Sequence, residues 1–209
     1  MRTITRASPA ECRRPMAADS LIPTPLATFT RAVTIGAPPQ RVWPWLAQMG
    51  SGRAGWYSYD LIDNDGAPSS RSILPEHQRV AVDDVFPALP GAKDAFVVSA
   101  VDVERELVLT ASSTDGELLV TWDFLLEPLA SIQTRLIVRA RVAPGWPPVP
   151  SGSRPIERIY RLLAATPKPL MLVLGRIGHG IMEVKMLRGI KGRAEHRETE
   201  LSVAPKAAP

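Results

Sequence analysis

The segment from Arg53 to Asp60 carries the densest set of side chains able to do chemistry. Residues 56–60 read Trp-Tyr-Ser-Tyr-Asp, so an indole N–H, two phenol hydroxyls and a carboxylate lie within five positions. Buried Tyr and Trp side chains need hydrogen-bond partners for their polar ends, and several such groups can converge on one ligand. In the alternative, Trp56 and Tyr57 pack under a preceding helix and Asp60 caps a turn. We predict that four of these side chains line a ligand cavity: Arg53, Trp56, Tyr57 and Tyr59.

A histidine and a glutamate also lie one helical turn apart, at His179 and Glu183. This spacing would suit an acid–base pair. An α-helix turns by about 100° per residue, however, so His179 lies about 180° from Leu170, which belongs to an apolar stripe of the same predicted helix. We therefore expect the pair to lie on a solvated face. The chain has no Gly-x-Ser-x-Gly motif and no Cys–His pair near the apolar core, so catalytic residues stay unknown.

Residues 50–55, Gly-Ser-Gly-Arg-Ala-Gly, match the Gly-x-Gly-x-x-Gly pattern of dinucleotide-binding loops. A loop of that kind follows a strand and opens the helix of a parallel βαβ unit. Here the motif follows a helical pattern and precedes antiparallel strands, so we interpret the match as accidental. We expect a loop near the cavity entrance, in which Gly50, Gly52 and Gly55 adopt unusual φ values.

The composition excludes several function classes. The single Cys12 rules out an internal disulfide, and the three histidines have no metal-binding spacing, so we expect no metal and no cofactor. The 25 basic and 21 acidic residues are spread along the chain, and we expect no nucleic-acid binding despite the net charge of +4. No signal-peptide pattern and no apolar run of about 20 residues is present, which predicts a cytoplasmic protein without a transmembrane segment.

Hydrophobic periodicity predicts the elements that must position these residues. A strand over 29–35 precedes a helix over 40–49, and a short helix is expected near 56–61. Five strands then follow, at 78–86, 95–103, 106–113, 117–127 and 133–142. Two helices, over about 153–165 and 168–197, end the chain. The strict alternation in 117–127 and 133–142 indicates an antiparallel sheet with one face in water.

The last predicted helix carries a continuous apolar stripe formed by Leu170, Val173, Leu174, Ile177, Ile181 and Val184. We expect this stripe to cover the inner face of the sheet. Trp122 and Phe124 have the inward parity of their strand. For Trp122 two interpretations stay open: it lines the cavity, or it is a plain core residue. Met182 and Met186 lie beside the stripe, where soft side chains shape a cavity wall or simply pack.

Three stretches resemble a known superfamily. Residues 32–46, Ala-Val-Thr-Ile-Gly-Ala-Pro-Pro-Gln-Arg-Val-Trp-Pro-Trp-Leu, resemble the opening strand and first helix of the START/Bet v 1-like, or SRPBCC, proteins. Residues 53–60 and 182–191 resemble an uncharacterised bacterial branch related to polyketide cyclase/dehydrase-type proteins. The resemblance covers about residues 28–197. It implies an α+β helix-grip fold, in which a curved antiparallel sheet wraps around a long C-terminal helix, with two short helices after the first strand.

The resemblance also implies a function. We expect a helix-grip domain over 26–198 that binds a hydrophobic small molecule or lipid in a cavity between the sheet and the C-terminal helix. The alternative is a polyketide cyclase- or aromatase-like enzyme, for which Arg53, Tyr57 and Tyr59 are the candidate proton donors. Residues 1–25 hold four prolines and no periodicity, so we predict a disordered or loosely ordered leader, and we predict a disordered tail over 199–209. The sequence does not give the oligomeric state.

Overall fold

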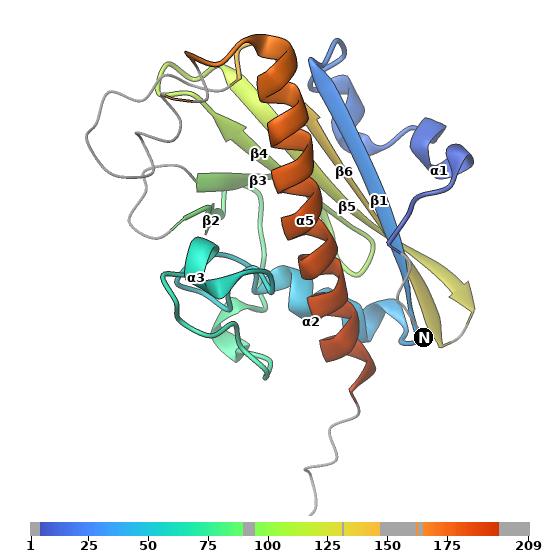
Figure 1. Ribbon diagram of the computed structural model, residues 1–209. Coiled ribbons are helices and arrows are strands. Elements are labelled where there is room, and N and C mark those ends of the chain that lie inside the picture. The colour runs from blue at the N-terminus through green and yellow to red at the C-terminus, as the bar shows by residue number, and fades with distance from the viewer. Residues whose placement is uncertain (1–4, 90–94, 131, 147–161, 163–164, 197–209) are drawn as a thin grey trace, which may run out of the picture.

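One antiparallel sheet and one long helix dominate the computed structural model, which describes residues 5–89, 95–130, 132–146, 162 and 165–196. The sheet has six strands in the order β1-β6-β5-β4-β3-β2, and every neighbouring pair is antiparallel. The helix α5 crosses one face of the sheet (Figure 1). The strands are β1 (Ala27–Ile35), β2 (Val85–Pro87), β3 (Ala95–Asp102), β4 (Glu106–Ser112), β5 (Leu118–Ala130) and β6 (Gln133–Val142).

Short helices fill the chain between β1 and β2. They are α2 (Pro39–Ala47), α3 (Asp60–Asp63) and the 3-10 helix η2 (Pro75–His77). Pro39 suits the start of α2, because the first helical N–H has no partner within the helix. The helix predicted over 40–49 is thereby confirmed, as are five of the six strands. The predicted strand over 78–86 is wrong for most of its length, because pairing begins at Val85 and ends at Pro87.

The C-terminal helix α5 (Lys168–Glu195) is held to the sheet mainly by its second half. Met186, Leu187, Ile190 and Ala194 are buried against α2 and the sheet. The Lys191 ammonium donates a hydrogen bond to the Thr34 carbonyl on β1 at 2.8 Å. No helix within the described residues combines the length and apolar character needed to cross a bilayer. The predicted helix over 153–165 lies largely outside the described residues.

The orientation of the first half of α5 is opposite to the prediction. Five of the six residues of the apolar stripe face outward, each with about half of its surface exposed: Leu170, Val173, Leu174, Ile177 and Ile181. The sixth, Val184, is half-buried. His179 and Glu183 face the sheet instead, and Glu183 is buried. The reason is geometric. The buried residues of the second half fix the rotation of the helix, and the same face, continued toward the N-terminus, reaches Glu183 and His179.

Residues 5–25 of the leader, which was predicted to be disordered or loosely ordered over 1–25, have regular structure. They form α1 (Pro9–Arg13) and the 3-10 helix η1 (Ala17–Ser20), and they pack on the face of the sheet that α5 leaves free (Figure 1). Met16 joins Ala32, Leu125 and Ile137 in a small apolar cluster there. This face is therefore not a wet face throughout, contrary to the prediction. The predicted tail over 199–209 lies outside the described residues.

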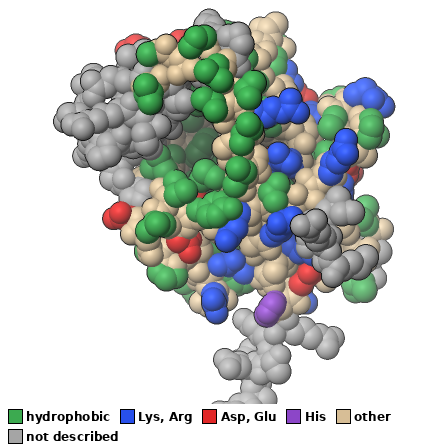
Figure 2. Space-filling view, viewed as in Figure 1, with side chains coloured by type: hydrophobic (Ala, Val, Ile, Leu, Met, Phe, Trp, Pro, Cys, Tyr) green, Lys and Arg blue, Asp and Glu red, His purple; other side chains and the backbone are tan. Residues whose placement is uncertain are grey.

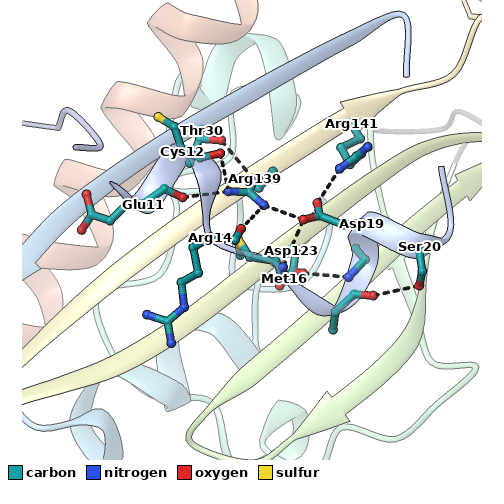
Figure 3. A network of polar contacts seen from close by, with 12 residues as sticks. Glu11, Cys12, Arg14, Met16, Asp19, Ser20, Thr30, Asp123, Arg139 and Arg141 are labelled. Carbon is teal, nitrogen blue, oxygen red and sulfur yellow. Dashed lines mark hydrogen bonds and ion pairs between the residues drawn. The ribbon is translucent and has the colours of Figure 1, made fainter. Parts of the chain in front are cut away.

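Arg139 on β6 anchors this leader (Figure 3). Its guanidinium is almost fully buried and donates hydrogen bonds to the backbone carbonyls of Glu11, Cys12 and Arg14, and to the Asp19 carboxylate at 2.7 Å. Three long-range carbonyl contacts and one ion pair thus bind a segment that has almost no local periodicity. The order of the leader comes from the sheet.

Asp123, beneath the leader, predicts a pH dependence of stability. Its carboxylate accepts the Ala18 N–H at 3.0 Å, and burial raises its pKa to about 7. An Asp in the unfolded chain titrates near its ordinary value of about 4. Between these values the folded state binds the proton more tightly, so this group makes the free energy of unfolding fall as the pH rises from about 4 to 7.

We expect Asp123→Asn to remove this contribution. Urea unfolding gives the free energy of unfolding at pH 5 and at pH 8. Between these two pH values we expect it to fall by at least about 1.4 kcal/mol more in the wild type than in the variant, the equivalent of one pKa unit. The difference between the two proteins is the proper readout, because burial also raises the pKa of Asp63, to about 6. Parallel stability curves for the two proteins would contradict this assignment.

Candidate functional site

Three charged or titratable side chains meet between α5 and β1, and we call them the polar cluster: Arg31, His179 and Glu183. The Glu183 side chain has no exposed surface. Its Oε2 lies 3.0 Å from Arg31 Nε, and its Oε1 lies 3.4 Å from His179 Nε2. Burying a carboxylate is costly unless a cation lies close to it. Arg31 supplies that charge, and His179 adds to it when protonated.

The backbone of α5 approaches Arg31 closely because Gly180 has no side chain. A Cβ atom at this position would lie 2.5 Å from Arg31 Nη2. Arg31 itself has the inward parity of β1, the same as the buried Val33 and Ile35. The sequence thus places one long cation on the strand and a glycine opposite it on the helix.

Aromatic rings surround the polar cluster on the sheet side. The indole of Trp122 stacks on Trp56, with ring centroids 5.4 Å apart, and also contacts Phe96 and Phe124. We call these four residues the aromatic wall. The His179 ring lies 6.0 Å from Trp122 and 5.3 Å from Phe29. The imidazole therefore joins the aromatic wall to the buried Glu183 carboxylate.

Several polar atoms at this point lack hydrogen-bond partners among the described residues. They include Trp122 Nε1, His179 Nε2 and both carboxylate oxygens of Glu183, all shielded from solvent. Glu183 lies within ion-pair distance of Arg31 and of His179, but neither contact has hydrogen-bond geometry. Buried polar groups in native proteins are usually hydrogen-bonded, so exceptions need an explanation. A donor, two acceptors and an imidazole at one place in an aromatic environment fit the features of a small-molecule site.

The structure brings together three of the residues predicted from sequence, namely Trp56, Trp122 and Phe124. Trp122 faces inward as its strand parity indicates, and Phe124 beneath it is fully buried. Trp56 is buried and donates its indole N–H to the Ala88 carbonyl at 3.0 Å. Met186 lies in the core under α5, while Met182 is half-buried beside Glu183. A ligand-binding role for each of them stays a prediction.

Arg53, Tyr57 and Tyr59 each have partners within the protein, and their shared ligand-binding role stays a prediction. The Arg53 guanidinium lies 4.4 Å from the Phe86 ring centroid and donates to the Ala47 carbonyl. The buried Tyr57 hydroxyl donates to the Trp45 carbonyl at 3.0 Å, and burial raises the pKa of this phenol. Tyr59 lies at the surface, with Lys185 4.8 Å from its ring centroid. The Tyr57 hydroxyl is thus already engaged within the protein.

The glycine-rich loop closes on itself. Gly50 and Gly55 form an antiparallel bridge, and the φ values of Gly50, Gly52 and Gly55 are +126°, +71° and +77°. The unusual φ values predicted for these glycines are thus confirmed. The loop follows the helix α2 and opens no helix of a parallel unit, so the geometry of a dinucleotide loop is not present here.

Two surface grooves run along the side of α5 that faces β1. One has a volume of about 650 Å³ and is lined by α5 residues between Val173 and Arg188. The other, of about 950 Å³, reaches the leader. Three residues line both grooves: Arg31, Val173 and Arg176. Arg31 therefore connects the polar cluster to the surface.

The hydrophobic periodicity of the first half of α5 predicts that His179 and Glu183 lie on a solvated face, so it misses both as site residues. The signal that would have found them lies in the second half of the helix. Glu183 precedes the buried Ile190 by seven positions, and His179 precedes the buried Met186 by seven. A separation of seven residues is two helical turns, so both lie on the core-facing side. Within the described residues, no group of three or more His, Cys, Asp and Glu side chains could hold a metal ion.

Comparison with known proteins gives structural likenesses at low sequence identity. No protein-family model and no curated protein matches the chain. A polyketide-cyclase-like protein from Corynebacterium glutamicum is 18% identical, covers 78% of this chain and 88% of its own, and has a TM-score of 0.43. The Zhui aromatase/cyclase from Streptomyces sp. R1128 is 13% identical over 81% of this chain and 93% of its own, with a TM-score of 0.45. A protein from Chromobacterium violaceum is 17% identical over 81% and 98%, with a TM-score of 0.44.

The protein has the helix-grip fold. This assignment comes from its own topology, an antiparallel sheet crossed by a long C-terminal helix, with α2 and α3 after the first strand. The α+β class and the helix-grip architecture predicted from sequence are thus confirmed. A shared fold does not determine a function, so any activity of this helix-grip protein has to be argued from its own side chains.

Proposed function

We propose that this protein binds a hydrophobic small molecule or lipid between the sheet and the first half of α5. The aromatic wall would contact the apolar body of the ligand. The Trp122 N–H and the polar cluster would bind one polar group of the ligand, such as a carbonyl or hydroxyl. This placement is close to the cavity expected from sequence, with the polar cluster in place of Arg53, Tyr57 and Tyr59.

One observation carries the proposal. Trp122 Nε1, His179 Nε2 and the Glu183 carboxylate are buried without hydrogen bonds, at the point where the aromatic wall meets α5. A ligand hydroxyl would donate to Glu183, and a ligand carbonyl would accept from Trp122. Two features support access of a ligand from outside. Trp122 and Phe96 are only half-buried, and Figure 2 shows a recess beside α5 with hydrophobic side chains at its floor.

Titration with the neutral fluorophore N-phenyl-1-naphthylamine tests the proposal. We expect binding by the wild type, and an affinity lowered at least about fivefold in Trp122→Ala, because a stacking surface is lost. Leu107→Ala is the matched control. Leu107 is a fully buried β4 residue that pairs with Phe124 across the sheet, and both substitutions should destabilise the fold by about 3 kcal/mol.

Two outcomes would contradict the proposal. One is a Trp122→Ala protein that loses stability but keeps the affinity of the wild type for the fluorophore. The other is an equal loss of affinity in Leu107→Ala, which would mean that destabilisation alone explains the effect. Native mass spectrometry of freshly purified protein adds a direct search for a bound molecule, which would appear as a discrete mass increment lost on denaturation.

The enzyme alternative is supported by the His179–Glu183 pair. An imidazole 3.4 Å from a buried carboxylate, with Arg31 beside it, has the composition of a general base with a cation to stabilise an enolate. Deuterium exchange at the α-carbon of the neutral ketone α-tetralone tests it. Exchange above the buffer rate that His179→Ala abolishes would favour an enzyme. Binding of the ketone without faster exchange would favour the carrier function.

A further inference from the structure

The outward side of α5 exposes five large aliphatic residues, which we call the outer face: Leu170, Val173, Leu174, Ile177 and Ile181. Their exposed fractions lie between 47% and 55%. Over these 12 positions an α-helix rises by about 17 Å, and the hydrophobic side chains form a continuous band over the upper part of α5 in Figure 2. Large exposed apolar patches with a polar rim mark sites of protein or membrane interaction.

The rim of the outer face is basic. The groove along its flank, of about 650 Å³, is lined by Val173, Ile177 and Ile181 together with four cationic side chains: Arg31, Arg176, Lys185 and Arg188. Among the residues that the structure describes, no acidic one lines this groove or the neighbouring one of about 950 Å³. Figure 2 shows Lys and Arg side chains alongside and below the apolar band. Tyr59, a residue type that suits the boundary between lipid and water, also lines the groove.

We propose that the outer face of α5 docks on the surface of an anionic lipid bilayer. A helix with an aliphatic face and Lys or Arg at its border lies in the plane of the membrane, with its apolar side among the upper acyl chains. Arg176 and Lys185 at the rim attract acidic headgroups, which supplies the charge complementarity, whereas Arg31 already compensates the buried Glu183. A second copy of the chain fits less well, because it would bring two copies of Arg176 and Lys185 together with no acidic residue among the described lining of either groove.

Sedimentation of the full-length protein with large unilamellar vesicles tests this proposal. We expect binding to phosphatidylcholine vesicles that contain 30% phosphatidylglycerol, weaker binding at 0.5 M salt, and little binding to pure phosphatidylcholine. The double variant Ile177→Ser/Ile181→Ser should bind at least about tenfold more weakly. The matched control is Leu129→Ser/Ile132→Ser at the β5–β6 turn, where the exposed fractions are 55% and 67%. This control should bind like the wild type.

Three results would overturn the proposal. The first is no binding of the wild type to anionic vesicles. The second is equal binding of the two double variants to the vesicles. The third is a wild-type protein that does not bind vesicles but forms a dimer, which Ile177→Ser/Ile181→Ser abolishes, because a second copy would then cover the outer face. Thermal melts of both double variants check folding. The affinity for N-phenyl-1-naphthylamine in the absence of vesicles should not change, which separates this surface from the interior site.

Discussion

Gly189→Ala is expected to destabilise the protein by about 3 kcal/mol, the upper range for forcing an extra methyl group into a packed contact. A Cβ atom at position 189 would overlap the carbonyl oxygen of Tyr57 and lie 2.8 Å from its Cβ. Tyr57 cannot move easily. Its backbone has a φ of +57°, its hydroxyl is bonded to the Trp45 carbonyl, and the Arg193 guanidinium lies 4.5 Å from its ring centroid.

The control for this substitution is Gly192→Ala on the same helix, where a Cβ would meet nothing within 4 Å. That change should stabilise α5 by up to about 1 kcal/mol through helix propensity. Thermal melts provide the measurement. We expect the melting temperature of Gly189→Ala to fall by roughly 6–12 °C, while that of Gly192→Ala stays level or rises. Similar melting temperatures for the two variants would contradict the close approach of α5 to Tyr57.

Arg139→Met should release the N-terminal leader and cost about 3–5 kcal/mol, as expected when one partner of a buried ion pair is removed. The substitution preserves much of the side-chain length. It leaves the carbonyls of Glu11, Cys12 and Arg14 without the guanidinium donors that bind them, and removes one of the two arginines paired with Asp19. Limited trypsin digestion at Arg13 should therefore become faster, whereas Arg14 precedes Pro15 and is not a tryptic site.

Arg105→Met is the control for the leader experiment. The Arg105–Asp102 ion pair is exposed, with 72% and 58% of the side-chain surfaces accessible, and such pairs contribute little. We expect the cleavage rate and the stability of this variant to match the wild type. If Arg139→Met also showed wild-type cleavage at Arg13, Arg139 would not be the anchor of the leader.

The sheet could be predicted well because strand periodicity is local. In β5 every second residue faces α5, so the strand parity alone predicts the correct face for Trp122 and Phe124. The short strand β2 could not be predicted, because three residues give no pattern and the preceding segment 78–84 has strand-like composition without pairing.

The leader and α5 show where local patterns mislead. The leader has four prolines and little periodicity, and its contacts, such as those with Arg139 and Arg135, come from residues more than a hundred positions away. In α5, the strongest apolar stripe would mark the face toward the sheet only if the helix had no second apolar surface that contacts something else. The candidate site was therefore predicted in part. Trp122 and Trp56 follow from the sequence, whereas His179 and Glu183 depend on a helix rotation fixed by the second half of α5.

The most direct test of ligand binding between the sheet and α5 is an NMR titration of the tryptophan indole N–H signals with N-phenyl-1-naphthylamine. The chain has five tryptophans, and a Trp122→Phe variant identifies the signal of Trp122. We predict that this signal shifts most during the titration and shows nuclear Overhauser contacts to the fluorophore. Contacts of the fluorophore to Ile177 and Ile181 on the outer face, with an unchanged Trp122 signal, would contradict the proposed interior site.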